Sequence, residues 1–424
     1  MLIYTPKITP RISYTFSVIF ERILNCPVSF ITNIDLFSAS TEPKMAYSPH
    51  KIDTPIWMEA TPLLFEKKVV KQNIKSEERG KDALFFSTKK GDFSIDIAAV
   101  VFFLISRYEE YYKGIELDKH GRFQCKNSVA YQLGWHRKLM VHRLALALAQ
   151  IIKAQYPKFV FSLPKFEELI THDVDIAYQY KGKSWWHWCG AVAKALLQFR
   201  FEHARNYLKT ALGEEVDDPF DNYKPEVCTQ KPVYFIPTCP FGKYDKNISY
   251  KSKAFKELVI KLMEFSEIGI HPSYRSSTKK SLILKEKKRL EEVSQLPITK
   301  SRQHYLRFRF PGTFQALLKA GITDDYSLGW HDEAGFRASI AVPYPFFDLT
   351  KNEETKLMFH PLVLMDTVFN KDEEQTVYNE LRKEVKEMGG SFIVLTHNSN
   401  VEPVLSSDPF CDDDCWILSE LAHK

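Results

Sequence analysis

The residues ELITHDVDIAYQY (168–180) indicate the architecture of this chain, because two carboxylates, Asp173 and Asp175, close an apolar run with strand character. Leu169 and Ile170 suit burial, and the polar residues follow at once. An α/β barrel delivers acids to the carboxyl ends of its strands in this way. A strand followed by a turn, in which Asp satisfies loop amides, fits the same residues. Taken alone, the pattern leaves both interpretations open.

From Pro164 to the end, β-like runs alternate with helix-length patterns. The runs include PVYFIPT, IGIHPSY and SFIVLTH, and helices are expected over 254–265, 279–293 and 372–388. Strands separated by helices predict a parallel sheet, and this many in one domain predict a barrel. The fold class that we expect is therefore α/β, with a (β/α) barrel over 164–424.

The first part of the chain, residues 1–163, predicts a smaller α/β domain. Short β-like runs alternate there with helical patterns over 14–24, 94–112 and 141–156. A chain of 424 residues exceeds what one core usually organises. Two domains are the natural expectation, and the function of the first is unknown.

Composition excludes several classes of protein. The 58 basic and 53 acidic residues give a net charge of +5, which argues against a nucleic-acid partner. The longest apolar run, 97–105, is far shorter than the roughly 20 residues of a membrane span. The first residues lack a secretory signal, and seven scattered cysteines suit reduced thiols, so we expect a cytoplasmic protein.

A helical insertion over about 181–230 carries an unusual tryptophan cluster. Trp185, Trp186 and Trp188 lie in a basic, amphipathic segment. Indoles near lysines suit peripheral contact with a membrane surface, or a lid that stacks on sugar rings. Packing onto the barrel explains them equally well.

Polar residues that could act in catalysis or bind a metal lie at the predicted strand ends. They are Asp173, Asp175, His271, Arg302, His304, Asp325, Arg337 and His397. A single histidine at a strand end is usually structural, but three of them with two aspartates on one barrel face favour a site. Two aspartates and two histidines suit Zn²⁺ or a similar divalent ion that activates water.

The motifs THDVD, GIHPSY, SRQHYLRF and LTHN resemble, in order and spacing, those of the NodB-homology polysaccharide deacetylase family, carbohydrate esterase family 4. The whole chain resembles two-domain proteins of this type from Bacteroidetes. IFERIL, SRYEEYY and HGRF carry the N-terminal resemblance, and about 165–424 carries that of the barrel. The resemblance implies a distorted barrel of about seven strands, one divalent metal and removal of the acetyl group from an N-acetylated sugar.

The resemblance also implies roles for the first two motifs. Asp173 matches the family's general base and Asp175 its first metal ligand. His271 matches the first histidine of the second motif, but Arg275 stands where the family has a second histidine, and an arginine cannot bind a cation. Either His304 substitutes for that ligand, or the site has lost its metal.

The remaining motifs supply the other roles that the resemblance implies. Arg302 would keep Asp173 ionised, although the 309–311 stretch competes for that alignment. His397 matches the histidine that protonates the leaving amine. Asp325 or Arg337 is a candidate to orient His397, and the two could equally form a structural ion pair.

The function that we expect is metal-dependent N-deacetylation of a lipid-linked or nucleotide-linked sugar intermediate of surface polysaccharide biosynthesis. The metal would be Zn²⁺, with Co²⁺ or Ni²⁺ as alternatives. Two other readings remain open: a hydrolase of a small amide or ureide, as in the allantoinase-like branch, and a metal-free barrel that binds sugars or acts as a scaffold. Arg275 favours the last of these, and fold alone does not settle activity.

Overall fold

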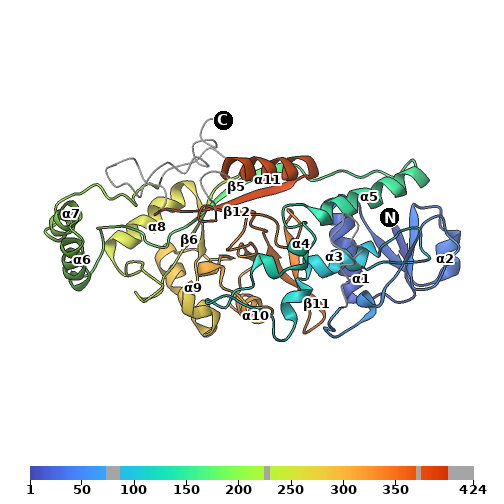
Figure 1. Cartoon of the computed structure of the whole chain (residues 1–424), viewed down its shortest axis with the longest axis horizontal. Helices are drawn as coiled ribbons and strands as arrows, with labels where there is room; N and C mark the ends of the chain where they lie inside the picture. The colour runs from blue at the N-terminus through green and yellow to red at the C-terminus, as the bar shows by residue number, and fades with distance from the viewer. Residues whose placement is uncertain (73–85, 224–229, 369–373, 400–424) are drawn as a thin grey trace. The chain divides into compact units, whose positions relative to one another are not determined.

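The computed structural model describes residues 1–72, 86–223, 230–368 and 374–399 (Figure 1). The chain divides into two compact units. The first consists of Met1–Glu167, Leu306–Leu318 and Thr323–Ile393, and the second of Glu168–Tyr305, Lys319–Ile322 and the chain from Val394 onward.

A small parallel sheet opens the first unit. Its strands are β1 (Leu2–Tyr4), β2 (Ser29–Ile31), β3 (Lys44–Ser48) and β4 (Trp57–Glu59), in the order β2-β1-β3-β4. The residues of β3 from Met45 onward are buried, as expected of a strand inside a parallel sheet. The predicted small α/β arrangement at the start of the chain is therefore present.

Helix α3 (Ile97–Ile105) forms part of the core of this unit. All nine of its residues are buried, which explains why its sequence is apolar on every face. Asp96 is the N-cap, and its carboxylate accepts a hydrogen bond from the N–H of Ala99 at 2.9 Å. The helix is shorter than the 94–112 pattern predicted, and residues Tyr108–Tyr111 form a 3₁₀ turn.

The other elements of the first unit are mostly short. The helices are α1 (Pro10–Ser17), which continues as a π-helical turn (Val18–Ile23), α2 (Ile34–Ala39), α4 (Val129–Gln132), α5 (Met140–Gln155), α10 (Gly312–Lys319) and α11 (Glu374–Met388), with 3₁₀ turns at Pro62–Phe65 and Cys125–Asn127. The strands are β9 (Asp324–Asp325), β10 (Tyr344–Asp348), β11 (Glu353–Phe359) and β12 (Leu364–Met365). Strand β11 pairs antiparallel with β10 and parallel with β9.

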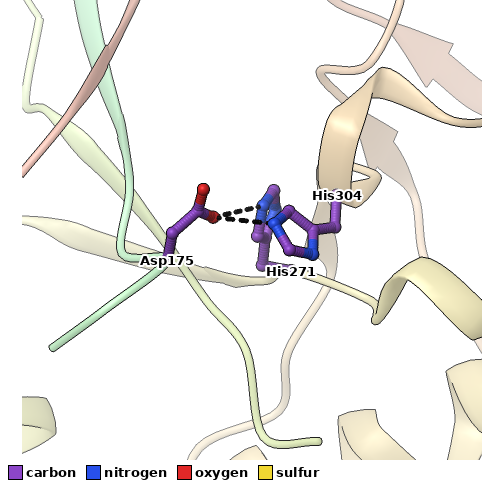
Figure 2. Close-up of side chains that lie close together, drawn as sticks. All are labelled: Asp175, His271 and His304. Carbon is purple, nitrogen blue, oxygen red and sulfur yellow. Dashed lines mark ion pairs between the residues drawn. The ribbon is translucent and has the colours of Figure 1, made fainter. Parts of the chain in front are cut away.

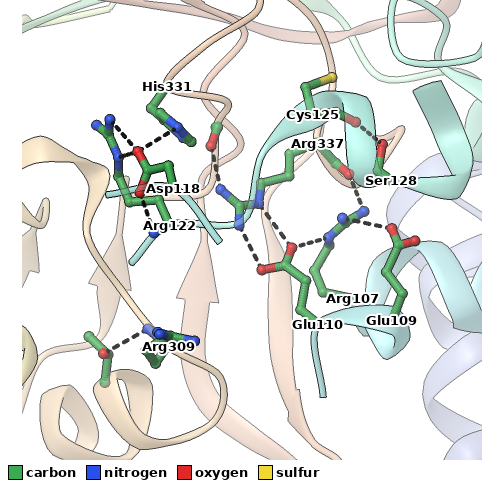
Figure 3. Close-up of polar contacts among 12 residues, drawn as sticks. Arg107, Glu109, Glu110, Asp118, Arg122, Cys125, Ser128, Arg309, His331 and Arg337 are labelled. Carbon is green, nitrogen blue, oxygen red and sulfur yellow. Dashed lines mark hydrogen bonds and ion pairs between the residues drawn. The ribbon is translucent and has the colours of Figure 1, made fainter. Parts of the chain in front are cut away.

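A buried ion-pair network stabilises this unit (Figure 3). Glu110 lies between Arg107, 2.8 Å from its Nε, and Arg337, 2.6 Å from its Nη2. Arg107 also pairs with Glu109 and donates to the carbonyl of Arg337. The guanidinium of Arg337 stacks on Trp330. Every charge in this network is met by an opposite charge or a hydrogen bond, as burial requires.

The second unit is built on a parallel sheet. Its strands are β5 (Phe166–Asp173), β6 (Val233–Ile236), β7 (Glu267–Ile270) and β8 (Lys300–Ser301), which pair in that order. The end of β13 (Gly390–His397) lies beside β5. Helices α8 (Lys253–Phe265) and α9 (Ser281–Ser294) connect successive strands, and 3₁₀ turns follow β7 at Tyr274–Ser277 and β8 at His304–Leu306. The carboxyl ends of these strands meet at one edge of the sheet.

The insertion between β5 and β6 forms a helical hairpin of α6 (Trp185–Leu197) and α7 (Phe201–Ala211), which lie side by side at the left of Figure 1. Of α6 only Ala195 is buried, and of α7 only Ala204 and Tyr207. The hairpin therefore exposes much of its apolar surface. Its predicted helical character is confirmed.

The expected α/β class is confirmed. The barrel, its strand number and the domain boundary at 163/164 stay predictions. In the described part of the chain, no helix combines the length and the apolar character that crossing a membrane requires.

Candidate metal centre

The turn after β5 presents Asp175. Two side-chain amides fix this turn: Asn247 Oδ1 accepts from the N–H of Ala177 at 3.0 Å, and Asn398 Nδ2 donates to the carbonyl of Ile176 at 2.8 Å. Both asparagines are buried. The position of Asp175 is thus set by polar contacts from two other loops of the same unit.

Asp175 faces two histidines, one from the end of β7 and one from the end of β8 (Figure 2). Its Oδ1 lies 3.2 Å from His271 Nε2 and 3.3 Å from His304 Nε2. One ligand atom from each residue falls within 4.8 Å of the others. Two imidazoles and a carboxylate are a common ligand set for a catalytic divalent metal with open positions.

The other ring nitrogen of each histidine is already engaged. His271 Nδ1 donates to the carbonyl of Arg302 at 2.7 Å, because a carbonyl oxygen can only accept. His304 Nδ1 lies 2.9 Å from Asp245 Oδ1. In the neutral rings, both Nε2 lone pairs therefore point at the cluster, which is the tautomer that a metal ligand needs.

Two atoms of the cluster lack a hydrogen bond. Asp175 Oδ1 and His271 Nε2 are buried without one, since their 3.2 Å approach does not have hydrogen-bond geometry. Buried polar atoms are usually satisfied, so orphaned acceptors that converge are what an absent cation would leave. The donor set and the orphaned atoms thus both fit a divalent metal.

The charges of the cluster shift its pKa values strongly. Burial lowers the pKa of His304, but Asp175 and Asp245 outweigh it and raise that pKa to about 10. Burial raises the pKa of Asp175, but the positive charge of His304, together with the nearby ring nitrogens of His271 and His397, holds it well below its usual value. The cluster therefore attracts positive charge, and without a metal a proton on His304 supplies it.

Asp173 lies beside the cluster and is paired with Arg302. Its Oδ1 is 3.2 Å from Arg302 Nη1, and its Oδ2 is 3.6 Å from His271 Nε2. The buried guanidinium also donates to Thr171 Oγ1 at 2.7 Å and stacks on the ring of Phe235 at 4.5 Å. Asp173 thus has one oxygen paired with a guanidinium and the other facing His271.

A glycine makes room for this arrangement. A Cβ on Gly269, in β7, would lie 2.7 Å from the ring of Phe235, the ring on which Arg302 stacks. Any larger residue would displace that ring. The pattern IGIH therefore serves the site as well as the strand.

His397 reaches the cluster from the end of β13. Its Nε2 lies 3.9 Å from Asp175 Oδ2, and its side chain is 15% exposed. With Asp175, whose side chain is 26% exposed, it is one of the two members of the group that a substrate can reach. Its neighbour Asn398 is tied by hydrogen bonds to Ile176 and Tyr223, which fixes the turn.

The structure thus brings six of the eight predicted site residues into one unit. Asp325 and Arg337 belong to the other unit, where Asp325 accepts from Ser327 and Arg337 pairs with Glu110. Their role in orienting His397 stays a prediction. Arg275 is exposed on the 3₁₀ turn after β7 and is not a member of the cluster.

Asp245 is a site residue that the sequence analysis missed. It accepts from His304 Nδ1 and, at 2.9 Å, from the N–H of Tyr274. Burial raises the pKa of Asp245, but the hydrogen bonds from His304 and Tyr274 outweigh burial, and the pKa is lowered overall. Its signal was an acid in the loop that follows strand β6.

Three tyrosines border the cluster. The ring of Tyr244 stacks on that of Tyr274 at 4.0 Å, and Tyr305 packs against both and against His304. Tyr305 is 37% exposed and has a left-handed backbone, with φ of 62°. These rings give one side of the site an apolar, aromatic border.

Comparisons with known proteins give little further. Residues 1–157 match a family of unknown function, DUF7033. No curated protein matches the chain. A crystal structure from Mycobacterium smegmatis, named as that of a polysaccharide deacetylase, is 16% identical, with a TM-score of 0.32, and covers 56% of this chain and 79% of its own. A likeness of that size supports no statement about this chain.

Proposed function

We propose that the second unit is a metal-dependent hydrolase that removes the acetyl group from an N-acetylated sugar intermediate of surface polysaccharide biosynthesis. The convergence of Asp175, His271 and His304, with two orphaned acceptors, is the observation that carries this proposal. The sugar substrate rests on the resemblance of the motifs to polysaccharide deacetylases.

The residues of the chain divide the chemistry between them. A divalent cation, Zn²⁺ or alternatively Co²⁺ or Ni²⁺, would be held by Asp175, His271 and His304 and would polarise a carbonyl and activate water. Asp173 would take the proton of the attacking water on Oδ2, because Arg302 engages Oδ1.

His397 completes the reaction. Its Nε2 would give a proton to the amine nitrogen as the C–N bond breaks, so that water and the amide become acetate and a free amino sugar. Base and acid come from the ends of neighbouring strands, β5 and β13, so that both would lie close to one scissile bond.

Metal content and acetate release test this function. Mass spectrometry of the full-length protein, loaded with zinc, cobalt or nickel, should give one bound metal, lost in Asp175→Asn and His304→Ala. Asp324→Asn is the matched control, because Asp324 pairs with His360 at 2.7 Å outside any such cluster. Failure of the wild type to bind any metal would exclude the hydrolase and leave the sugar-binding reading.

The substrate class is tested separately. Acetate release from N-acetylated sugars would support the deacetylase, whereas turnover of a small amide or ureide alone, by a metal-loaded protein, would move the activity to the second candidate. The wild type and Asp173→Asn should be compared, because loss of the base removes turnover and leaves the three metal ligands in place.

We also propose that the α6–α7 hairpin contacts a membrane surface. Eight large apolar side chains are exposed on or beside it: Trp185, Trp186, Leu196, Leu197, Phe199, Phe201, Leu208 and Leu212. Lys194, Arg200 and Arg205 are exposed among them, which suits anionic lipid. Trp188 differs, because its indole donates to the carbonyl of Tyr180 and anchors the hairpin.

Vesicle sedimentation tests this contact. The full-length protein should pellet with vesicles that contain anionic lipid, and the double variant Leu197→Ser/Phe199→Ser should remain in the supernatant. Val160→Ser is the control, because Val160 is equally exposed, at 79%, but lies in the first unit. Equal sedimentation of both variants would contradict a role for the hairpin.

A further inference from the structure

A cavity lies in the same unit as the candidate metal centre. Its volume is about 710 Å³, and the loop after β6, the start of α8 and the residues just before α6 line it. This loop, residues 237–252, is also the one that supplies Asp245 and Asn247 to the metal centre. The cavity and the metal centre thus share a structural element.

The lining of this cavity is strongly basic. Lys183, Lys246, Lys251 and Arg289 contribute to it, and no carboxylate does. Within the described residues, none of the four forms an ion pair. Burial lowers the pKa of Lys183, and the charge of Asp218 raises it by less. Asp218 does not line the cavity, and its carboxylate accepts hydrogen bonds from the N–H groups of Gln179 and Tyr180.

Aromatic rings hold three of these cations in place. The ammonium of Lys246 lies 4.7 Å from the ring centre of Phe241. Arg289 lies 5.1 Å, and Lys251 5.8 Å, from the ring of Tyr250. Arg289 is fixed further by a hydrogen bond to the carbonyl of Thr238 at 3.0 Å. Cations with restricted positions lose less entropy when they bind an anion.

The start of α8 and a glycine complete the cavity. Ser252, the N-cap of this 13-residue helix, is part of the lining, and the amino end of a helix carries a partial positive charge. Gly182 has φ of 69°, and a Cβ there would lie 2.7 Å from Ile248. Glycine thus permits the tight turn that brings Lys183 and Ser184 to the cavity.

We propose that this cavity binds the phosphate or diphosphate group of the substrate. This inference rests on the proposed function, and it identifies the substrate as a phosphate-linked N-acetylated sugar. Four cations around one cavity suit a multiply charged anion, and Phe241 and Tyr250 suit a flat or apolar neighbour of that anion. Asn247 connects the two sites directly, because it lines the cavity and holds the turn that presents Asp175.

Calorimetric titration with inorganic pyrophosphate tests the inference. The full-length protein is first freed of metal, so that the anion cannot bind through a cation. The wild type should bind pyrophosphate at low salt, and Lys183→Gln and Arg289→Gln should each weaken binding by about 10-fold or more, as expected for loss of one charge-assisted contact. Higher salt should weaken binding further.

Two exposed lysines provide matched controls. Lys256 on α8 and Lys285 on α9 lie on the same helices as the cavity wall but do not line it, and Lys256→Gln and Lys285→Gln should bind as the wild type does. Absence of pyrophosphate binding, or equal weakening in the controls, would overturn the inference. Metal content and acetate release from a phosphate-free sugar report on the proposed hydrolase independently of these variants.

Two further ligands distinguish the source of the diphosphate. Tighter binding of a nucleoside diphosphate than of pyrophosphate would support a nucleotide-linked sugar. Tighter binding of a prenyl diphosphate would support a lipid-linked sugar, whose chain could extend along the exposed hairpin that begins at Trp185. Weaker binding of both organic diphosphates than of pyrophosphate would contradict a substrate site.

Discussion

The two units each bury a group of charged residues, but the two groups differ in whether their polar atoms have partners. In the first unit, Glu110 is shared by Arg107 and Arg337, and each charge has a partner. In the second, Asp175 and His271 bring an oxygen and a nitrogen together without a hydrogen bond between them. A satisfied network stabilises the fold, whereas buried ligand atoms that converge without hydrogen bonds could hold a cation.

The pKa shifts show the same difference. Burial raises the pKa of Glu110, but Arg337 and Arg107 outweigh it, so that Glu110 stays ionised between the two guanidinium groups without any added ion. His304, by contrast, has its pKa raised to about 10 by two carboxylates, after burial lowers it. The second unit thus holds a proton where a metal would supply the positive charge.

The largest expected effect comes from Asp175→Asn. This change removes the single carboxylate among the three proposed ligands, and acetate release should fall by about 10⁴-fold, as when one member of a catalytic unit is lost. Metal content should fall with it. The free energy of unfolding of the metal-free protein should change less than in Glu110→Gln. A loss of stability without a loss of metal would mean that the Asp175 cluster, like the ion-pair network of the first unit, only stabilises the fold.

The next largest effect is expected in the first unit. Glu110→Gln leaves Arg107 and Arg337 buried without their shared carboxylate, and the free energy of unfolding should fall by about 4 kcal/mol. Urea unfolding measures it. Glu353→Gln is the control, because Glu353 forms an exposed pair with Lys351 and its loss should cost less than about 1 kcal/mol. Metal content should stay at the wild-type value in both.

The strand-end pattern predicted the centre because of a physical rule about parallel sheets. The carboxyl ends of β5, β7 and β8 meet at one edge, so Asp175, His271 and His304 meet although 129 positions separate the first from the last. His304 was expected as a substitute ligand because it follows a strand. Arg275 lies apart because a 3₁₀ turn, not an α-helix, follows His271.

The sequence could not identify partners that depend on distant packing. Arg337 was expected at a strand end, as Arg302 was, yet its carboxylate partner is Glu110, 227 positions away in the sequence. Asp245 lies in a loop without periodicity, and nothing in its neighbours specifies that it accepts from His304. Local patterns predict elements and their ends, and long-range pairing of charges follows only from the folded chain.

A buried histidine of the first unit sharpens the comparison. His142 uses both ring nitrogens: Nδ1 lies 3.2 Å from the carbonyl of Met388, and Nε2 accepts from the N–H of Ala341 at 3.1 Å. Burial lowers its pKa to about 4. His271 differs, because its buried Nε2 has no hydrogen bond and faces Asp175.

The pH dependence of stability should report this difference. Below pH 6.5 the unfolded chain protonates His142 and the folded chain does not until about pH 4, so its contribution to stability is complete above pH 6.5 and is lost as the pH falls. Over that window the loss should be about 3 kcal/mol. Urea unfolding of His142→Asn should show a correspondingly shallower decline, and an unchanged slope would contradict the assignment.

The smallest effect is expected from Asp245→Asn. Asp245 does not belong to the three-residue cluster but orients His304 through Nδ1, and loss of such a contact typically weakens metal affinity by about 10- to 100-fold. Competition with a chelator measures that affinity.

Asp218→Asn provides the matched control, because Asp218 is also a buried carboxylate of the second unit but accepts only from backbone N–H groups, at 2.7 Å from those of Gln179 and Tyr180. Asp218→Asn should lower the free energy of unfolding and leave metal affinity unchanged. Asp245→Asn should lower metal affinity and change the free energy of unfolding less. If both variants lost metal equally, Asp245 would be a structural carboxylate like those of the first unit. If only Asp245→Asn lost it, the second unit would contain a carboxylate that acts through a ligand, which the ion-pair network of the first unit has no reason to contain.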